Sequence, residues 1–239
     1  MIRLKLYPIG GIKLRISPSK EDYLKAIYDL KGAHQIVNNK SIADSLSVSA
    51  ASVSEMNNRL VKEGLISHIP YKGVQLTKKG IKAANLLIRK HRLWEVFLYE
   101  KLNFQWDKVH AEADRLEHAS SDLLIERLND FLDYPKYDPH GGIIPNADGT
   151  IDKNPIPLKP LKTVEKDDVF HIKEVVDDEE LLSYLFGNNI TLNHSYKLLN
   201  KDSYDGTVSI LDKDTKNTLT ISGKAVEKIH VQLIEKNDI

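Results

Sequence analysis

A stretch near the middle of the chain, residues 106–118, carries four side chains that are able to hold a metal ion. On a helix they fall within an arc of roughly 100°, beside an apolar stripe: His110, Asp114, Glu117 and His118. Carboxylates and imidazoles next to buried apolar surface are unfavourable unless a cation or a partner group neutralises them. The pattern therefore indicates a metal site, with structural salt bridges as the alternative interpretation.

Two shorter pairs add donors of the same kind. His91 and Glu95 are four residues apart, a spacing that places both side chains on one helix face, where they can bind the same ion. Asp138 and His140 stand in the turn sequence Asp-Pro-His-Gly-Gly. Either pair alone is more often an ordinary surface feature, but together with residues 106–118 they favour metal binding.

The donor types narrow the choice of metal. The chain has no cysteine, so every candidate ligand is a carboxylate oxygen or an imidazole nitrogen. Such sets suit Mn²⁺ or Fe²⁺ better than copper(I) or a structural zinc ion. We expect Mn²⁺ as the cofactor, with Fe²⁺ or another divalent ion as the alternative.

Helical periodicity and capping residues predict six helices that would position these donors. Ser19 and Asp22 form a capping box at the start of the first helix, although Asp22 could instead reach the metal ligands. Ser49 and Thr77 are expected to cap later helices. The predicted helices cover residues 19–31, 40–46, 50–63, 77–100, 106–118 and 121–132, and two short strands cover 65–69 and 74–76.

The order of helix, tight turn, helix and hairpin in the first part of the chain predicts a winged helix-turn-helix. Residues 1–90 hold 16 Lys and Arg against 6 Asp and Glu, a balance that suits a polyanionic partner. The alternative is that small residues only allow helix packing and that the lysines form an ordinary surface. The expected DNA contacts are Ser49, Ala51, Ser52, Ser54, Glu55, Asn57, Arg59 and Lys72.

The two ends of the chain differ from its middle in residue composition and in the structure that this composition predicts. Residues 1–16 read as a disordered basic arm rather than a signal peptide. Residues 143–163 contain repeated prolines and read as a linker, and the β-rich runs from residue 164 onward suggest a small β-barrel or open β-domain. No apolar run approaches the length of a membrane span, so we expect a cytoplasmic protein without a membrane partner.

Several of these segments resemble the diphtheria toxin repressor and manganese transport regulator family of metal-dependent repressors. The resemblance covers about residues 17–239 and rests on SKEDYLKAIY, SVSAASVSEM, GLISHIPYKGVQLTKKG, RKHRLWE, HAEADRLEH and DPHGG. It implies a mainly α first two-thirds and a small all-β, SH3-like last part. The domains would be a winged helix-turn-helix over 17–80, a helical dimerisation and metal-binding domain over 81–142, a linker over 143–163 and the SH3-like domain over 164–239.

The resemblance also implies two metal sites. The primary site falls on Asp22, Asp114, Glu117 and His118, and the second on His91, Glu95 and His110. In longer manganese-type members the Pro-His-Gly-Gly turn and an acid of the last domain join the second site; here these would be Asp138, His140 and an acid of Val176-Asp177-Asp178, with Asp178 favoured.

Departures from the family pattern bear on the metal. Iron-responsive members place Met and Cys where this chain has Asp22 and Asp114, and many relatives have Cys in the position of Asp138. These oxygen donors favour manganese. Short manganese members carry Glu in the position of Lys25, which argues against a paired two-manganese site there.

The function implied is a homodimeric, manganese-dependent repressor that binds a palindromic operator in double-stranded DNA and controls genes for metal-ion uptake. It would be no enzyme and would have no organic substrate. Two alternatives belong to other classes: a metal-dependent hydrolase whose cluster activates water, and a winged-helix regulator with an organic effector.

Overall fold

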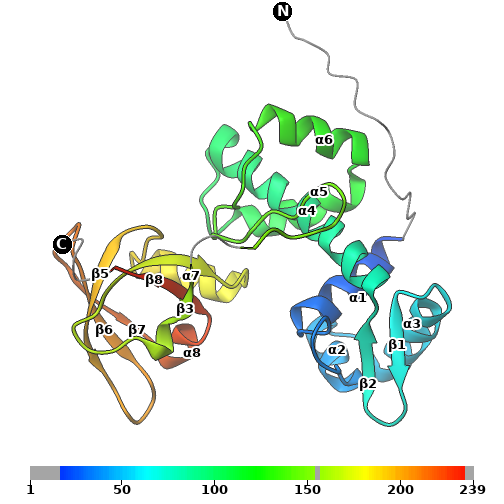
Figure 1. The fold of residues 1–239 in the computed structure, drawn as a ribbon, viewed down its shortest axis with the longest axis horizontal. Helices are drawn as coiled ribbons and strands as arrows, with labels where there is room; N and C mark the ends of the chain where they lie inside the picture. The colour runs from blue at the N-terminus through cyan, green and yellow to red at the C-terminus, as the bar shows by residue number, and fades with distance from the viewer. Residues whose placement is uncertain (1–16, 154–156, 235–239) are drawn as a thin grey trace, which may run out of the picture. The chain divides into compact units, whose positions relative to one another are not determined.

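The computed structural model describes residues 17–153 and 157–234, so the basic arm expected over 1–16 lies outside the described residues. Contacts divide the chain into two compact units (Figure 1). The first contains the chain up to Arg89 together with Pro145–Ile151, and the second contains Lys90–Ile144 and the chain from Asp152 onward. Of the helices in the described ranges, none combines the length and the apolar character that crossing a membrane requires.

The first unit is built from three helices, a hairpin and the beginning of a long fourth helix. Its elements are α1 (Pro18–Asp29), α2 (Asn39–Leu46), α3 (Ala50–Lys62), β1 (Ile66–Ile69), β2 (Gly73–Leu76) and the first half of α4 (Lys78–Leu102). Strands β1 and β2 pair antiparallel, with Ile66 opposite Leu76. One apolar core joins the helices to the hairpin and includes Leu24, Ile42, Val53 and Leu60. The predicted winged helix-turn-helix order is thus confirmed.

Local capping explains where these helices begin. Ser49 accepts a hydrogen bond from the backbone N–H of Ser52, 3.1 Å away, and Thr77 accepts one from Gly80 at 3.0 Å, as expected from the sequence. The capping box of Ser19 was wrong, because α1 already begins at Pro18, with Ser17 before it and no side-chain cap. Proline in the first helical position has a suitable φ and no N–H that needs a partner.

The helical part of the second unit contains the rest of α4 together with α5 (Val109–Ala119) and α6 (Asp122–Phe131). Leu93 and Val96 of α4 pack against Ile125 and Leu128 of α6. One face of α4 therefore packs against α6. A neighbouring face of the same helix carries the polar side chains of His91 and Glu95.

The last part of the chain forms a six-stranded antiparallel sheet, which confirms the predicted small β-domain. Its strand order is β3-β8-β4-β5-β6-β7. The domain also contains two helices that the sequence analysis did not predict. The elements are β3 (Lys159–Pro160), the 3₁₀ turn η1 (Leu161–Thr163), β4 (Val169–Val175), α7 (Glu179–Gly187), β5 (Ser195–Lys201), β6 (Val208–Asp212), β7 (Thr218–Ile221), α8 (Gly223–Val226) and β8 (Ile229–Leu233).

Residues 145–151, inside the stretch expected to be a linker, are bound to the first half of α4. Asn85 donates from Nδ2 to the carbonyl of Gly149 at 2.8 Å, and Arg89 donates from Nη1 to the carbonyl of Pro145 at 2.9 Å. Both side chains are buried. Repeated prolines therefore coexist here with an ordered path, because buried side-chain donors satisfy the carbonyls that prolines leave without a regular partner.

Gly80 is a position in the first unit where even the smallest substitution should be costly. A Cβ there would lie 1.9 Å from the carbonyl oxygen of Leu65. We expect Gly80→Ala to lower the free energy of unfolding by about 2 kcal/mol, as overpacking does, measured by urea denaturation. Gly187→Ala is the control, since a Cβ there meets nothing within 4 Å. Equal midpoints for the two variants would contradict the close packing of α4 on the backbone of Leu65.

Candidate metal centre

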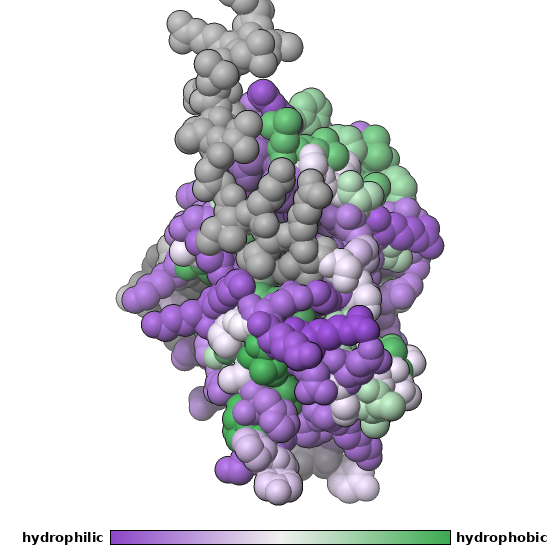
Figure 2. All heavy atoms as spheres, turned by 90° about the vertical axis from the view of Figure 1, so that its right-hand side faces the viewer, coloured by the Kyte–Doolittle hydropathy of each residue, from purple (hydrophilic) through white to green (hydrophobic). Residues whose placement is uncertain are grey.

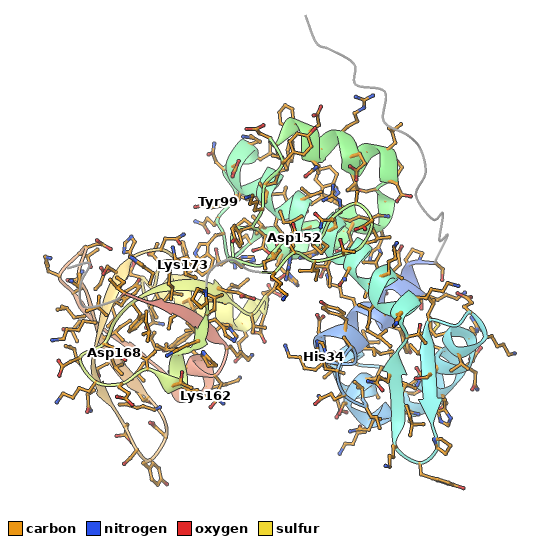
Figure 3. The ribbon with its side chains drawn as sticks, in the orientation of Figure 1. His34, Tyr99, Asp152, Lys162, Asp168 and Lys173 are labelled. Carbon is orange, nitrogen blue, oxygen red and sulfur yellow. The ribbon has the colours of Figure 1, made fainter. Side chains whose placement is uncertain are left out.

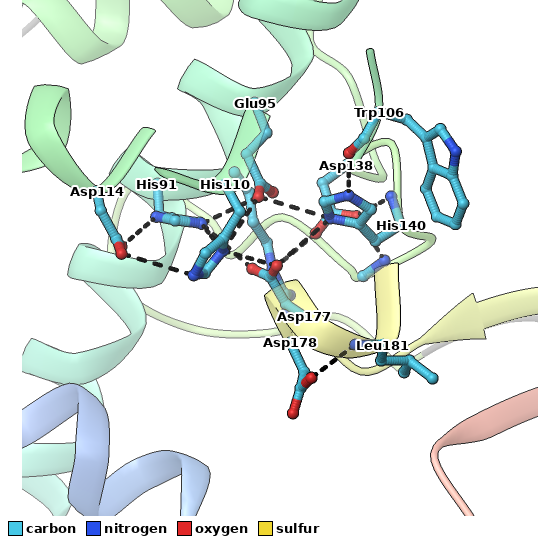
Figure 4. A network of polar contacts seen from close by, with 12 residues as sticks. His91, Glu95, Trp106, His110, Asp114, Asp138, His140, Asp177, Asp178 and Leu181 are labelled. Carbon is cyan, nitrogen blue, oxygen red and sulfur yellow. Dashed lines mark hydrogen bonds and ion pairs between the residues drawn. The ribbon is translucent and has the colours of Figure 1, made fainter. Parts of the chain in front are cut away.

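His91 lies at the centre of a buried cluster of ligand-type side chains (Figure 4). It is 2% exposed on α4. Its Nε2 is 3.0 Å from Oε1 of Glu95, one turn further along the helix, and 3.1 Å from Nδ1 of His110 on α5. The i, i+4 spacing and the facing helix thus bring two other predicted donors to one ring nitrogen of His91.

The other nitrogen of His91 faces two acids of α5. Nδ1 is 2.6 Å from Oε2 of Glu117 and 3.3 Å from Oδ1 of Asp114. His118 lies next to Glu117, with its Nε2 3.7 Å from Oε1 of that residue. The two donor sets that the sequence analysis treated as separate sites therefore adjoin, with the imidazole of His91 between them.

The β-domain contributes one carboxylate, from the residue that precedes the cap of α7. Asp177 places Oδ1 at 2.7 Å from Nδ1 of His110 and Oδ2 at 3.2 Å from Nε2 of His91. Together with Glu95 these residues form a four-membered group whose ligand atoms all lie within 4.8 Å of one another. A segment distant in sequence thus completes the cluster on α4 and α5.

The preference for Asp178 in the sequence analysis needs correction. Asp178 is the N-cap of α7: it accepts the backbone N–H of Leu181 at 2.8 Å and pairs with Lys228 at 2.6 Å. A capping carboxylate is committed to the helix N-terminus, so the preceding residue, Asp177, is the one that faces the histidines. The pattern of an acid followed three residues later by a leucine pair was present in the sequence and marks this cap.

The turn at residues 138–142 positions His140 beside the same cluster. His140 donates from Nε2 to the carbonyl of Trp106 at 2.8 Å, which leaves Nδ1 as the atom that can bind a cation when the ring is neutral. Nδ1 is 3.5 Å from Oε1 of Glu95. His140 thus lies where a ligand would be expected.

Asp138 holds this turn in place. Its Oδ1 accepts the backbone N–H groups of His140 and Gly142 at 2.8 and 2.9 Å, and its Oδ2 pairs with Nε of Arg92 at 2.9 Å. Both oxygens are therefore engaged by the turn and by α4. These contacts position the turn that carries His140. Asp138 also lies with Glu95 and His140 in a buried group whose ligand atoms are within 4.8 Å of one another, so its role as a metal ligand remains a prediction. Arg92 is a member of this network that the sequence did not suggest.

Gly141 allows the turn to approach the β-domain. Its φ is +88°, and a Cβ would lie 1.8 Å from the carbonyl oxygen of Lys173 on β4 (labelled in Figure 3). On the other side of the turn, the N–H of Val175 donates to the carbonyl of His140 at 3.0 Å. The Gly-Gly pair in the sequence therefore reflects a backbone position that a side chain would block.

The cluster has the buried, unsatisfied atoms that a cation would need. Among the described residues, Oε2 of Glu95 and Nδ1 of His140 are buried and have no partner at hydrogen-bond geometry, although Nδ1 lies 3.5 Å from Oε1 of Glu95. Glu95 is 0% exposed. Buried polar atoms without partners are rare and costly. A divalent ion held by carboxylate and imidazole groups would satisfy them, so the residues present fit a metal ion.

Electrostatics in the cluster couples the histidines to the acids. Burial lowers the pKa of His110, but hydrogen bonds to Asp177 and Glu95 outweigh it and raise this pKa to about 10. Burial likewise lowers the pKa of His140, but its interaction with the carboxylate of Glu95 outweighs this effect and raises the pKa to about 9. Burial raises the pKa of Asp138 to about 6 against the opposing charge of Arg92. Without a cation, protons on the histidines therefore compensate the buried carboxylates.

Asp22 is an exposed residue of α1 in the first unit. Its membership of the primary metal site therefore remains a prediction.

Most of the predicted DNA contacts are exposed on α3 and the hairpin. Figure 2, which views the molecule from the side of α3 in Figure 1, shows mostly hydrophilic side chains on that face. Ser54 donates to the carbonyl of Ala50 at 3.0 Å, and Glu55 forms an ion pair with Arg59. The exposed members are Ser49, Ala51, Ser52, Ser54, Glu55, Arg59 and Lys72.

Asn57 is the exception among these residues. It is 4% exposed, and its Nδ2 donates to Oδ1 of Asn39 at 3.0 Å. It therefore joins α3 to α2, and the prediction that it contacts DNA is wrong. The neighbouring Asn58, which the sequence analysis passed over, is the exposed amide on α3.

Two family models match the chain and together span both of its helical regions. Residues 15–74 match the N-terminal DNA-binding domain of iron-dependent repressors, and residues 77–146 match their metal-binding and dimerisation domain. The chain is also 37% identical over 125 residues to the iron-dependent repressor IdeR of Mycobacterium tuberculosis; this match covers 52% of the chain and 54% of that repressor.

Solved structures extend the likeness to nearly the whole chain. One, described as a manganese-dependent transcriptional repressor in complex with manganese, has 34% identity and a TM-score of 0.81, and the match covers 90% of this chain and all of that one. The manganese regulator SloR has 39% identity and a TM-score of 0.76 over 92% of this chain and all of that one. The protein therefore belongs to the iron-dependent repressor family, whose members are metal-dependent DNA-binding transcriptional repressors and not enzymes.

Proposed function

We propose that the metal to which this repressor responds is manganese, and that binding it increases affinity for a palindromic operator in genes for metal-ion uptake. The observation that carries this proposal is the cluster of His91, Glu95, His110 and Asp177, which offers only nitrogen and oxygen donors. Hard oxygen donors suit Mn²⁺ and Fe²⁺. Two similar solved structures are described as manganese-responsive proteins, which supports manganese over iron.

The proposed coupling runs through a second group of donors. Asp114, Glu117 and His118 on α5 would bind an ion together with Asp22 of α1. Such an ion would restrain the DNA-reading helices relative to the helical domain. A coupling free energy of about 1–3 kcal/mol between effector and ligand is typical of allosteric proteins and corresponds to roughly 5–150-fold in affinity.

A homodimer would present two copies of α3 to one face of DNA. Symmetric dimers of this fold class bind half-sites about one helical turn apart, or a multiple of that spacing, hence the palindrome. The exposed apolar side chains of α6, Leu123, Leu124 and Phe131, at 59%, 45% and 65% exposure, suit burial in a dimer interface. We further propose that the protein works in the cytoplasm, where it would meet both its metal and its operator.

The assignment of Asp177 as a metal-binding residue can be tested against its neighbour. We expect Asp177→Asn to weaken Mn²⁺ binding at least about tenfold, because it removes a charged donor from the cluster. Asp178→Asn should leave Mn²⁺ affinity unchanged, since asparagine also caps helices and only the ion pair to Lys228 is lost. Isothermal titration calorimetry measures both. The reverse order of affinities would restore Asp178 as the ligand.

Metal binding should depend on pH in a defined direction. The raised pKa values of His110 and His140, about 10 and about 9, mean that both rings carry protons at neutral pH in the metal-free protein. A ring must lose its proton to bind the ion, so Mn²⁺ affinity should rise with pH, by about tenfold per unit for each proton displaced. Calorimetry between pH 6.5 and 8 in buffers of different ionisation enthalpy gives the affinity and the number of protons released; a flat profile would contradict the histidine assignment.

DNA binding tests the repressor function as a whole. For DNA upstream of the protein's own gene and of metal-uptake genes, we expect Mn²⁺ to tighten binding by wild-type protein about tenfold and by Asp114→Ala less than twofold, measured in gel-shift titrations. Glu112→Ala is the matched control on the same helix, since the carboxylate of Glu112 pairs with Arg115 of its own helix and belongs to none of the metal-type groups of the described residues. Parallel titrations with iron, zinc and cadmium establish selectivity. Equal responses of wild type and Asp114→Ala would refute metal activation through α5.

A further inference from the structure

A cavity of about 290 Å³ lies in the second unit, beside the turn that carries His140. Four segments enclose it: the last turns of α4, the stretch before α5, the turn at residues 137–139 and the loop before β5. Asp138 and Pro139 therefore belong both to the turn of the metal centre and to the wall of the cavity. The four-membered ligand group around His91 does not line it, so the cavity is a separate space next to the metal cluster.

Aromatic side chains from three of these segments line the cavity. Tyr99 lies on α4 (labelled in Figure 3), Trp106 precedes α5, and Tyr137 begins the turn. The carbonyl oxygen of Trp106 accepts the hydrogen bond from Nε2 of His140 at 2.8 Å (Figure 4), and its side chain packs against the core of the β-domain. Tyr99 stays 45% exposed. Since these side chains border the space and do not fill it, a ligand inside it would contact aromatic surface.

The charge of the wall indicates which class of ligand fits. Among the described residues that line the cavity, Glu100 and Asp138 are acidic and none is a lysine, an arginine or a histidine. Asp138 is already paired with Arg92. Glu100 lies 3.3 Å from Lys101 in an exposed ion pair, and because such pairs are weak in water, its carboxylate can pair with another cation. The wall thus offers aromatic surface and one available negative charge.

We propose that this cavity binds a small organic ammonium ion, held by the rings of Tyr99 and Trp106 and by the carboxylate of Glu100. Cations are attracted to the faces of tryptophan and tyrosine rings, and aromatic cages recognise quaternary ammonium groups in this way. On the side of the β-domain, Lys173 already donates from Nζ to Oδ1 of Asn193 at 3.0 Å, so the partners of a charged ligand lie on the side of α4. Ligand pockets range from about 300 to 1,000 Å³, and a cavity near the lower limit suits a ligand of few heavy atoms.

Tyr134 provides a matched control for Tyr99. It is 48% exposed, nearly as much as Tyr99, and its hydroxyl donates to Oδ1 of Asp130 at 2.6 Å. It therefore combines an exposed ring with a neighbouring carboxylate, but it does not line the cavity. Binding that depends on Tyr99 and not on Tyr134 would show that the enclosed space, rather than any exposed tyrosine beside an acid, holds the ligand.

The test uses the full chain loaded with Mn²⁺ and two probes of the same shape, choline and its uncharged analogue 3,3-dimethylbutan-1-ol, in isothermal titration calorimetry. We expect choline to bind about tenfold more tightly than the alcohol, because only choline is charged. Tyr99→Ala and Glu100→Gln should each weaken choline binding about fivefold. Tyr99→Phe should stay within about twofold, because it keeps the ring, and Tyr134→Ala should bind choline as wild type does. Thermal unfolding of each variant reports whether its fold is intact.

Each other outcome overturns the proposal. Equal binding of choline and the alcohol would make the cavity an apolar space without preference for charge, and no binding of choline by wild type would refute the site outright. Choline binding that survives both Tyr99→Ala and Glu100→Gln would place the ligand elsewhere. Should Tyr99→Ala unfold at a lower temperature, Glu100→Gln decides, because it keeps the shape of an exposed side chain. Neither residue belongs to the metal-type groups of the described chain, so the manganese response is tested separately from this site.

Discussion

The second unit depends on the burial of an imidazole between carboxylates. His91 has acids at both ring nitrogens, Glu95 and Asp177 on one side and Glu117 on the other. Glu95 and Glu117 are 0% and 1% exposed, and a buried carboxylate without a compensating charge would cost several kcal/mol, of the order found for unpaired buried ions. The compensation must come from protons on the histidines or from a divalent cation. The same donors can hold either protons or a cation, so protons and a divalent ion would compete for them.

The cluster connects segments that are distant in the sequence. His91 and Glu95 belong to α4, His110 and Glu117 to α5, and Asp177 comes from the β-domain. His140 joins from a turn that is itself hydrogen-bonded to β4. A change of charge at the cluster therefore acts on the helical domain and on the β-domain at once. This is the physical basis on which a metal ion can alter the protein beyond its own ligands.

The parts of this centre that lie on single helices could be predicted from the sequence. The helical period places His91 and Glu95 on one face, and it groups His110 with Asp114 and Glu117, because spacing along one helix determines which side chains are neighbours. Even the inward position of Asn57 follows from this rule, since it lies four residues after Val53 and three before Leu60, both buried. An amide side chain on this helix suggests a base contact, but the helical period places this one in the interior.

The parts that join different elements could not be predicted by spacing alone. Whether Asp177 or Asp178 faces His110 depends on where α7 begins, and the strong β pattern around this nine-residue helix hid its start. The position of His140 beside the cluster depends on the φ of +88° at Gly141 and on the close approach of that glycine to the backbone of Lys173. The periodicity of the sequence predicts neither feature. Local rules determine which donors an element can present; the turn conformations and caps that end each element determine which of these donors meet. If the cap of a helix lies one residue earlier or later, a different side chain faces the cluster. Asp178 caps α7, and its neighbour Asp177 therefore faces His110.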